Sequence, residues 1–214
     1  SLLYIVICNI KVPANNSCLL GSVNLVNYVS DPFTDNASFN FGQFQDDVYT
    51  FNRLLDNVIE VSNLPLPIQQ QELQRKRRHG IGFLGIGSMF NMMKTRYGGS
   101  ESVRLTQKIS RILAETSLHA GCDLAEEKGP APIMNERFLI TNELVNKFPH
   151  LRESFLIGEY ALGKELIVHS EYMRRMPKAL TDKIQKIGIR FSHATSIAPT
   201  GTMALGIENN VSNG

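Results

Sequence analysis

The sequence predicts an α/β domain. Apolar residues recur at helical spacing in the long central stretches, and short runs rich in Leu, Val and Ile stand near both ends. Helix-like and strand-like segments therefore alternate at the two ends of the chain, which favours an α/β arrangement. With 214 residues, of which 43% are hydrophobic, the chain is long enough to bury a core as one domain.

In the first third of the chain, local signals predict a strand, a loop and a helix. Residues 19–29 (LLGSVNLVNYV) predict a strand or a buried turn and strand, and residues 30–38 predict a loop by their Pro, Asp, Asn and Ser content. An amphipathic helix is expected over residues 41–64, where Pro65 and Pro67 stop it. The apolar residues that set its spacing are Val48, Phe51, Leu54, Leu55, Val58 and Ile59.

The rest of the chain predicts further helices and a final strand. Residues 81–93 indicate a turn that leads into a buried helix, and residues 100–129 give the longest helix signal, ended by Gly129 and Pro130. Residues 131–176 are charged and irregular in pattern. Residues 177–188 predict another helix with Pro177 near its start, and residues 193–199 predict a strand that delivers a Pro-Thr-Gly-Thr turn.

Composition narrows the classes of function. The net charge of +2 gives no reason to expect nucleic acid or a membrane surface as the main partner. The apolar start of the chain is too short to cross a bilayer and lacks the basic region of a signal peptide. Cys8, Cys18 and Cys122 form neither a disulfide framework nor a zinc-like spacing, so we expect a cytoplasmic protein with no metal site of its own. The missing initiator Met and the abrupt end predict a piece of a longer protein.

Two motifs have an ordinary interpretation beside a functional one. Residues 80–85 fit the dinucleotide-binding pattern G-x-G-x-x-G, but they follow a basic run instead of a buried strand. Close packing, in which the glycines let a helix approach its neighbours, is the better interpretation. The basic run, residues 75–78, could contact phosphate, but such runs are usually solvated and no aromatic residue is interleaved here.

The Pro-Thr-Gly-Thr turn is a candidate anion site. Thr200 and Thr202 offer hydroxyl groups, and Gly201 lets the backbone approach a ligand closely. Successive N–H groups of residues 200–203 could form a concave anion site at the end of a strand. An ordinary tight turn remains the alternative. Cys18 stands at the entry to a predicted strand, where its thiol could face a cavity, although the sequence around it favours an ordinary buried thiol. Cys122 is expected to be a buried apolar residue of a helix.

Taken together, these segments resemble the catalytic subunit of ribonucleotide reductase. The "APTGT" turn followed by "NNVSNG" is the most specific part of the resemblance, which extends from about Ser17 to the end of the chain. "DPFT" and "APTGT" look most like the adenosylcobalamin-dependent class II enzymes. The stretches that carry the resemblance are "SCLLGSVNL" with "DPFTDNASF", residues 53–90, "CDLAEEKGPAP" and residues 189–214.

The resemblance implies a fold and a set of site residues. The fold would be the C-terminal portion of a ten-stranded α/β barrel, formed by residues 17–214. Pro199, Thr200, Gly201, Thr202 and Met203 would hold the phosphates of a ribonucleoside di- or triphosphate. Cys18 would be one of two redox-active thiols, with its partner on a strand that this chain lacks. A thioredoxin-like reductant would reset the pair.

The resemblance weakens at the start of the chain. The family places Asn-x-Cys-x-Glu shortly before the second redox cysteine, and its Cys carries the thiyl radical. Here Cys8 is preceded by Val6 where Asn is expected and followed by Ile10 where Glu is expected. An apolar Ile cannot act as a base, so Cys8 is a weak candidate for the radical cysteine. We therefore expect residues 1–16 to be non-homologous or divergent.

Two functions remain open at this stage. The chain is expected to be part of an enzyme that reduces ribonucleotides by thiyl-radical chemistry, active only with the N-terminal part of its subunit. Adenosylcobalamin would supply the radical; the alternative is a radical from a diiron small subunit. The second possibility is a truncated or divergent homologue that acts as a structural or regulatory nucleotide-binding piece.

Overall fold

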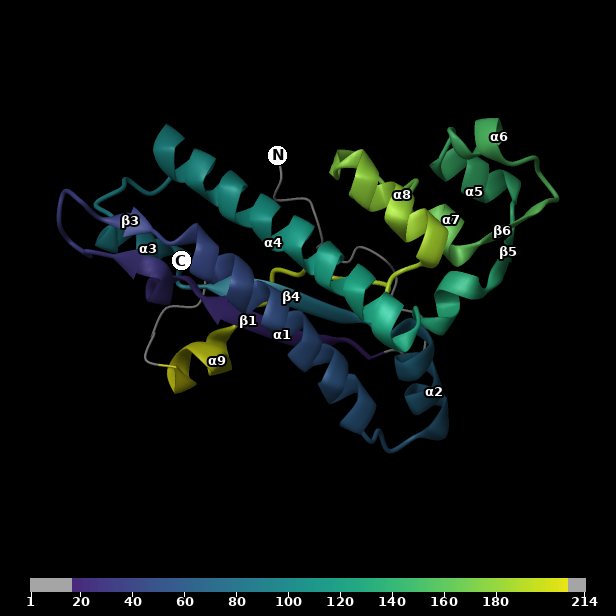
Figure 1. Ribbon diagram of the computed structural model, residues 1–214, viewed down its shortest axis with the longest axis horizontal. Helices are drawn as coiled ribbons and strands as arrows, with labels where there is room; N and C mark the ends of the chain where they lie inside the picture. The colour runs from purple at the N-terminus through teal and green to yellow at the C-terminus, as the bar shows by residue number, and fades with distance from the viewer. Residues whose placement is uncertain (1–16, 208–214) are drawn as a thin grey trace.

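The computed structural model describes residues 17–207, which form a mixed α/β structure dominated by helices (Figure 1). Within that range the strands form three two-stranded sheets, β1–β4, β2–β3 and β5–β6, and no closed barrel. β1 (Leu19–Asn24) and β4 (His79–Leu84) run parallel, with Leu19 opposite His79 and Asn24 opposite Leu84. The α/β class is confirmed.

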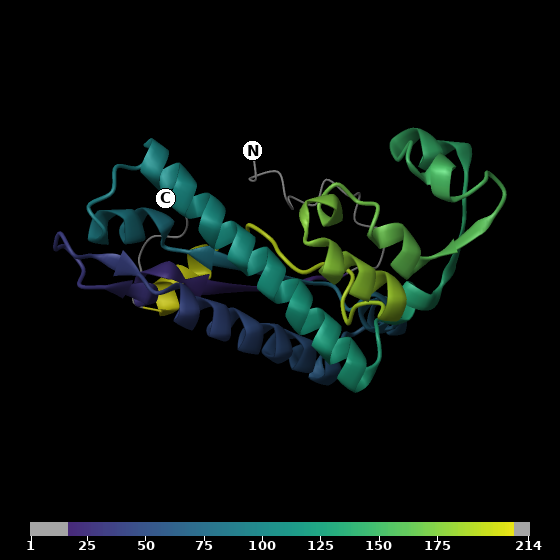
Figure 2. The same cartoon turned by 45° about the horizontal axis from the view of Figure 1, so that its top comes forward.

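Two long helices lie side by side against the β1–β4 sheet (Figures 1 and 2). α1 (Phe41–Val61) begins where the Asn40 side chain accepts a hydrogen bond from the Gln43 N–H, at 3.1 Å. α4 (Ser100–Lys128) ends at Gly129, whose φ of 85° lies in the left-handed region that favours glycine. Both helices therefore begin and end close to where the sequence predicts.

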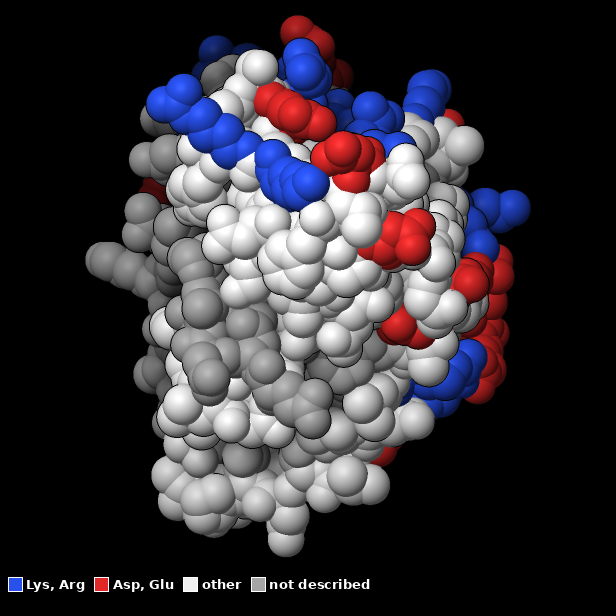
Figure 3. Space-filling model, turned by 90° about the vertical axis from the view of Figure 1, so that its left-hand side faces the viewer, with Lys and Arg blue, Asp and Glu red and all other residues white. Residues whose placement is uncertain are grey.

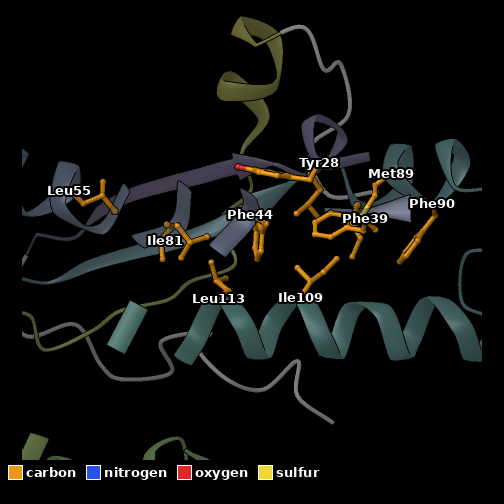
Figure 4. Packing of buried hydrophobic residues seen from close by; sticks show 12 residues of the cluster. Tyr28, Phe39, Phe44, Leu55, Ile81, Met89, Phe90, Ile109 and Leu113 are labelled. Atoms are coloured by element: carbon orange, nitrogen blue, oxygen red, sulfur yellow. The ribbon is translucent and has the colours of Figure 1, made fainter. Parts of the chain in front are cut away.

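The main core lies between the sheet and these helices (Figure 4). Phe44 and Val48 of α1 contact this core with no exposed surface, as do Ile81 of β4 and Ile109 of α4. Burying a side chain of this size contributes about 1.5–3 kcal/mol, so the cluster is the main force that holds the helices on the sheet. Leu54, expected on the apolar face of α1, is instead 51% exposed.

The segment between α1 and α4 differs from the prediction. The polar residues after Pro65 form a helix, α2 (Pro67–Lys76), which ends at Arg77 in the left-handed conformation, with φ of 45°. β4 then occupies the place where a turn was expected, and α3 (Ile86–Met92) follows it. The turn prediction was wrong because the glycines of this segment lie inside a buried parallel strand, where close packing replaces side chains.

Residues 131–176 were predicted to be irregular, but they form a small unit with its own core. Its hairpin pairs β5 (Arg137–Leu139) with β6 (Tyr160–Leu162). Ile140, Val145, Leu151 and Ala161 form the buried cluster under this hairpin. The other short elements of the unit are η3 (Pro132–Asn135), α5 (Asn142–Lys147), α6 (Leu151–Ser154), α7 (Gly163–Ile167) and η4 (Met173–Arg175).

The last elements return the chain to the sheet. α8 (Lys178–Ile187) forms as predicted, with Pro177 as its N-cap residue. An extended segment then runs along β4 and leads into the short helix α9 (Gly201–Gly206). Figure 4 shows α9 and α4 on opposite sides of the strands. The remaining short elements, near the other end, are η2 (Leu25–Tyr28), β2 (Val29–Ser30) and β3 (Ser38–Phe39). Across residues 17–207, no helix has both the length and the apolar character needed to span a membrane.

Candidate functional site

The candidate site is built on three parallel segments. Beside β1 and β4 runs the extended segment of residues 193–197, joined to β4 by a parallel bridge between Ile81 and Thr195. The Ile81 N–H donates to Ala194 O at 2.9 Å, and the Ser196 N–H donates to Ile81 O at 3.0 Å. The strand expected at residues 193–199 is thus an extended segment held by a single bridge, and it does deliver the Pro-Thr-Gly-Thr turn.

Two glycines of β4 allow this third segment to approach. A Cβ on Gly82 would lie 2.4 Å from the backbone oxygen of Ser196, and one on Gly80 would lie 2.6 Å from the Ser196 Cβ. Both glycines lie within the strand, and Gly85 begins α3 with a φ of 75°. The close-packing interpretation of G-x-G-x-x-G is confirmed, although a strand segment, not a helix, makes the approach. The dinucleotide interpretation lacks its required position after a strand.

The turn at residues 199–203 exposes backbone donors at the start of α9. Thr200, not Gly201, takes the left-handed conformation, with a φ of 55°. Its hydroxyl donates to Pro199 O at 2.8 Å, and its carbonyl accepts from the Ala204 N–H at 2.9 Å. Gly201 and Thr202 are exposed, and a Cβ on Gly201 would meet nothing within 4 Å. N–H groups in the first turn of a helix have no acceptor within the helix, so those of residues 201–203 can serve a ligand.

The surroundings of this turn carry little charge. Residues 17–30 and 191–207 contain no Asp, Glu, Lys or Arg. In Figure 3 charged side chains of both signs occupy the top and the right-hand side of this end of the molecule, and the described atoms at the lower left are largely uncharged. An anion at residues 199–203 would therefore be held by backbone and hydroxyl groups of this chain, with any balancing cation supplied from outside these two segments.

Cys18 stands at the other end of the parallel segments. It directly precedes β1 and is exposed, so the ordinary interpretation of Cys18 as a buried thiol was wrong. The Leu19 N–H donates to Arg78 O at 3.2 Å, so Cys18 lies level with the start of β4. Thr195 is level with Ile81, about three residues or 10 Å further along, and the turn follows it. Cys18 and the turn thus lie toward opposite ends of the same three segments.

Of the other two cysteines, the structure describes Cys122 but not Cys8. Cys122 is fully buried in α4, and burial raises its pKa to about 12, which confirms the expectation of an inert apolar residue. Cys8 lies outside the described residues, as do residues 208–214. Within residues 17–207, no group of three His, Cys, Asp or Glu side chains is placed to hold a metal ion.

The basic run of residues 75–78 is not a solvated face. Arg77 is 3% exposed, and its Nη2 lies 2.6 Å from Oδ1 of the fully buried Asp56 of α1. Arg190 donates to the same carboxylate through Nε at 3.1 Å, and Lys128 reaches its other oxygen at 3.3 Å. Burial by itself would raise the pKa of Asp56, but the hydrogen bond from Arg77 and the charges of Arg77 and Arg190 lower it.

A second buried polar group crosses the core beside this cluster. His79 donates through Nε2 to Asn52 Oδ1 at 3.1 Å, and Asn52 donates to Ser117 Oγ at 3.2 Å. Burial lowers the pKa of His79 to about 3, so its ring is neutral at neutral pH. Sequence reasoning missed both groups. The signal that would have found them is the placement of Asn52 and Asp56 on the apolar stripe of α1, between Val48 and Ile59.

The α/β fold places a hydroxyl-bearing turn after a parallel segment, which is the position where open α/β sheets generally bind their ligands. The chain belongs to the ribonucleotide reductase family: residues 7–214 match the model described as "Ribonucleotide reductase, barrel domain". This match includes residues 7–16, for which we expected divergence.

Three curated relatives illustrate the similarity. The chain is 30% identical over 116 residues to the vitamin B12-dependent ribonucleoside-diphosphate reductase of Thermoplasma acidophilum, covering 54% of this chain and 15% of that protein. It is 25% identical over 191 residues to the ribonucleoside-diphosphate reductase subunit alpha of Chlamydia pneumoniae, covering 87% of this chain and 17% of that protein. It is 27% identical over 201 residues to the ribonucleoside-diphosphate reductase large subunit of vaccinia virus (strain Copenhagen), covering 91% of this chain and 22% of that protein. The chain thus spans about a fifth or less of these relatives' length.

Proposed function

We propose that this chain forms part of the catalytic subunit of a ribonucleotide reductase and contributes the phosphate-binding turn and one redox thiol. The observation that carries the proposal is the family match over residues 7–214, together with a turn whose exposed N–H groups follow a parallel segment. The relatives' names favour a ribonucleoside diphosphate as the substrate. A cytoplasmic location suits the thiol chemistry.

In this proposal residues 199–203 fix the phosphates and Cys18 supplies reducing electrons. Replacing the ribose 2′-hydroxyl by hydrogen takes up two electrons and two protons and releases water. Cys18 and a second thiol from the remainder of the subunit supply them as they close to a disulfide. An external thioredoxin-like dithiol then reduces that disulfide by exchange. Cys8 remains a weak candidate for the radical thiol.

The radical would come from adenosylcobalamin, as the B12-dependent relatives suggest, or from a diiron small subunit. Neither nucleic acid nor a membrane has a part in this proposal.

A non-catalytic, structural or regulatory role is the second candidate, favoured by Val6 and Ile10 in place of the expected Asn and Glu. Reconstitution separates the two. The chain is mixed with the N-terminal part of its subunit, a ribonucleoside diphosphate, a dithiol and adenosylcobalamin, and deoxyribonucleotide is measured. We expect product from the mixture and none from the chain alone. Nucleotide binding without product, with either radical source, would favour the non-catalytic role.

A further inference from the structure

Cys18 and Arg78 occupy neighbouring positions on one face of the β1–β4 pair. A Cβ on Gly80 would lie 3.2 Å from Leu20 Cδ2, and one on Gly82 would lie 3.3 Å from Ser22 Oγ, so residues 20, 22, 80 and 82 share a face. Side chains alternate along a strand, which puts the preceding members of the two rows, Cys18 and Arg78, on this face as well. The hydrogen bond from the Leu19 N–H to Arg78 O keeps the two residues level.

Arg78 differs from the other basic residues of its run. Arg77 pairs with Asp56, and Lys76 pairs with Glu72 at 2.5 Å. Arg78 is only 4% exposed, its Nε has no hydrogen-bond partner among residues 17–207, and no carboxylate of that range forms an ion pair with it. A buried guanidinium without an anion is costly, so this side chain is poised to stabilise a negative charge beside it.

The third parallel segment reaches the same end of the strands as Arg78, since the His79 N–H donates to His193 O at 3.4 Å. His193 of the third segment lies here, and its pKa is lowered to about 4 by burial and by the charges of Arg78 and Lys76. The Lys76 backbone oxygen accepts from the Ser192 N–H, which brings α2 and the third segment together. Glu72, the carboxylate that pairs with Lys76, also pairs with Arg75. Arg78 is thus a cation at this end of the strands that forms no ion pair with a carboxylate of residues 17–207.

We propose that Arg78 is a positioning residue for Cys18, whose guanidinium stabilises the Cys18 thiolate and thereby speeds disulfide exchange. The proposal rests on the redox role of Cys18 proposed above. When the dithiol reductant attacks the partner sulfur of the disulfide, the S–S bond breaks and Cys18 leaves as a thiolate. The second thiol of the reductant then releases the partner cysteine and becomes oxidised. A leaving thiolate beside Arg78 departs faster because its charge is stabilised.

The test measures the alkylation rate of Cys18 against pH in the reconstituted subunit, by mass spectrometry of the peptide that carries it. Arg78→Gln is expected to move the midpoint of the profile upward by about 0.5–1 pH unit, which lowers the rate at pH 7 about threefold to tenfold. Arg78→Lys should retain the wild-type profile because it keeps the charge. Arg104→Gln removes an equally basic but exposed side chain of α4 and should change nothing. An unchanged profile in Arg78→Gln, or an equal loss in Arg78→Lys, overturns the proposal.

A measurement on the wild-type protein covers the case in which Arg78→Gln does not fold. The ratio of alkylation rates by anionic iodoacetate and neutral iodoacetamide should be higher at Cys18 than in the urea-unfolded chain, and should fall with added salt. A ratio equal to that of the unfolded chain overturns the proposal. These readouts need no turnover. If Cys18→Ser kept wild-type turnover, that result would contradict the proposed redox function. The interaction between Arg78 and Cys18 could still be measured by these alkylation rates.

Discussion

The thiols of Cys18 and Cys122 occupy opposite environments, and this difference predicts opposite mutational effects. Cys18 is exposed at a strand entry, whereas Cys122 is fully buried with a pKa raised to about 12 by burial. In the reconstituted reductase, Cys18→Ser should yield less than about one deoxyribonucleotide per active site, because one remaining thiol cannot supply two electrons or close a disulfide. Cys122→Ser should sustain multiple turnovers with a dithiol. Wild-type turnover in Cys18→Ser would remove Cys18 from the mechanism.

The turn at residues 199–203 permits an unusually clean test, because Gly201 has open space around it. A Cβ there meets no protein atom within 4 Å, so Gly201→Val should fold and yet obstruct a phosphate. Thr202→Ala removes one exposed hydroxyl and should weaken substrate binding by about 0.5–3 kcal/mol. Both variants should mainly raise KM, because the turn binds the phosphates equally strongly in the ground state and the transition state.

The matched control lies at the other end of the same helix. A Cβ on Gly206 also meets nothing within 4 Å, so Gly206→Val makes the same change away from the first turn and should bind nucleotide normally. Thermal unfolding of all three variants checks the fold. Normal affinity in a folded Gly201→Val would leave the turn an ordinary tight turn.

Among single residues, the sequence predicted those that can be recognised from their neighbours in the chain. The turn and the strand-entry cysteine could be found because both are defined by their immediate neighbours. Asp56, His79 and the pairing of Arg77 could not, since their burial depends on Arg190 and Phe191, more than a hundred residues further along the chain.

Among the elements, one buried carboxylate joins four of them. Asp56 of α1 forms ion pairs with Arg77 at the end of α2, Lys128 at the end of α4 and Arg190 in the segment after α8. Arg190 also donates to the carbonyls of Lys128 and Gly129, at 3.1 and 2.9 Å, and so caps the end of α4. Asp56 therefore holds the helical layer to the start of the third parallel segment.

Asp56→Asn should lower the free energy of unfolding by about 3–5 kcal/mol, because it leaves buried cations without their carboxylate. The folded-state pKa of Asp56 is lowered, so its stabilising contribution is present above about pH 4 and is lost as the pH falls through the folded value. Urea unfolding at several pH values would measure both effects. Asp46→Asn, on the exposed side of α1, is the control and should cost little. Equal stability of the two variants would contradict this role.

The elements that the sequence predicted best are those with strong periodicity and clear stops. α1, α4 and α8 repeat apolar residues over several turns, and a proline or glycine follows the end of each, so their limits follow from local signals. β4 was missed because its glycines suggest a turn, and only contact with Ser196 explains them. The hairpin of residues 137–162 was missed because its strands are three residues long and its core is small.

For the molecule as a whole, the α/β class followed from the alternation of elements, and the family match confirms that the chain is a portion of the barrel domain. Residues 17–207 do not close a barrel by themselves. The sheet here has two strands and one bridged segment, and a barrel needs more strands to close. The chain spans about a fifth or less of its relatives, so strands from the remainder of the subunit would have to complete it.

The same three parallel segments have a consequence for the rate of folding. Leu19 pairs with His79, 60 residues away (79 − 19), and Ile81 bridges to Thr195, 114 residues away (195 − 81). Contacts between such distant residues form only after long loops have closed, and chains that depend on them fold slowly. Helical turns in α1 and α4 can form from local contacts well before that. The edge that receives residues 193–197 would then be the last part of the sheet to be covered during folding, and the part most open to mispairing with another chain.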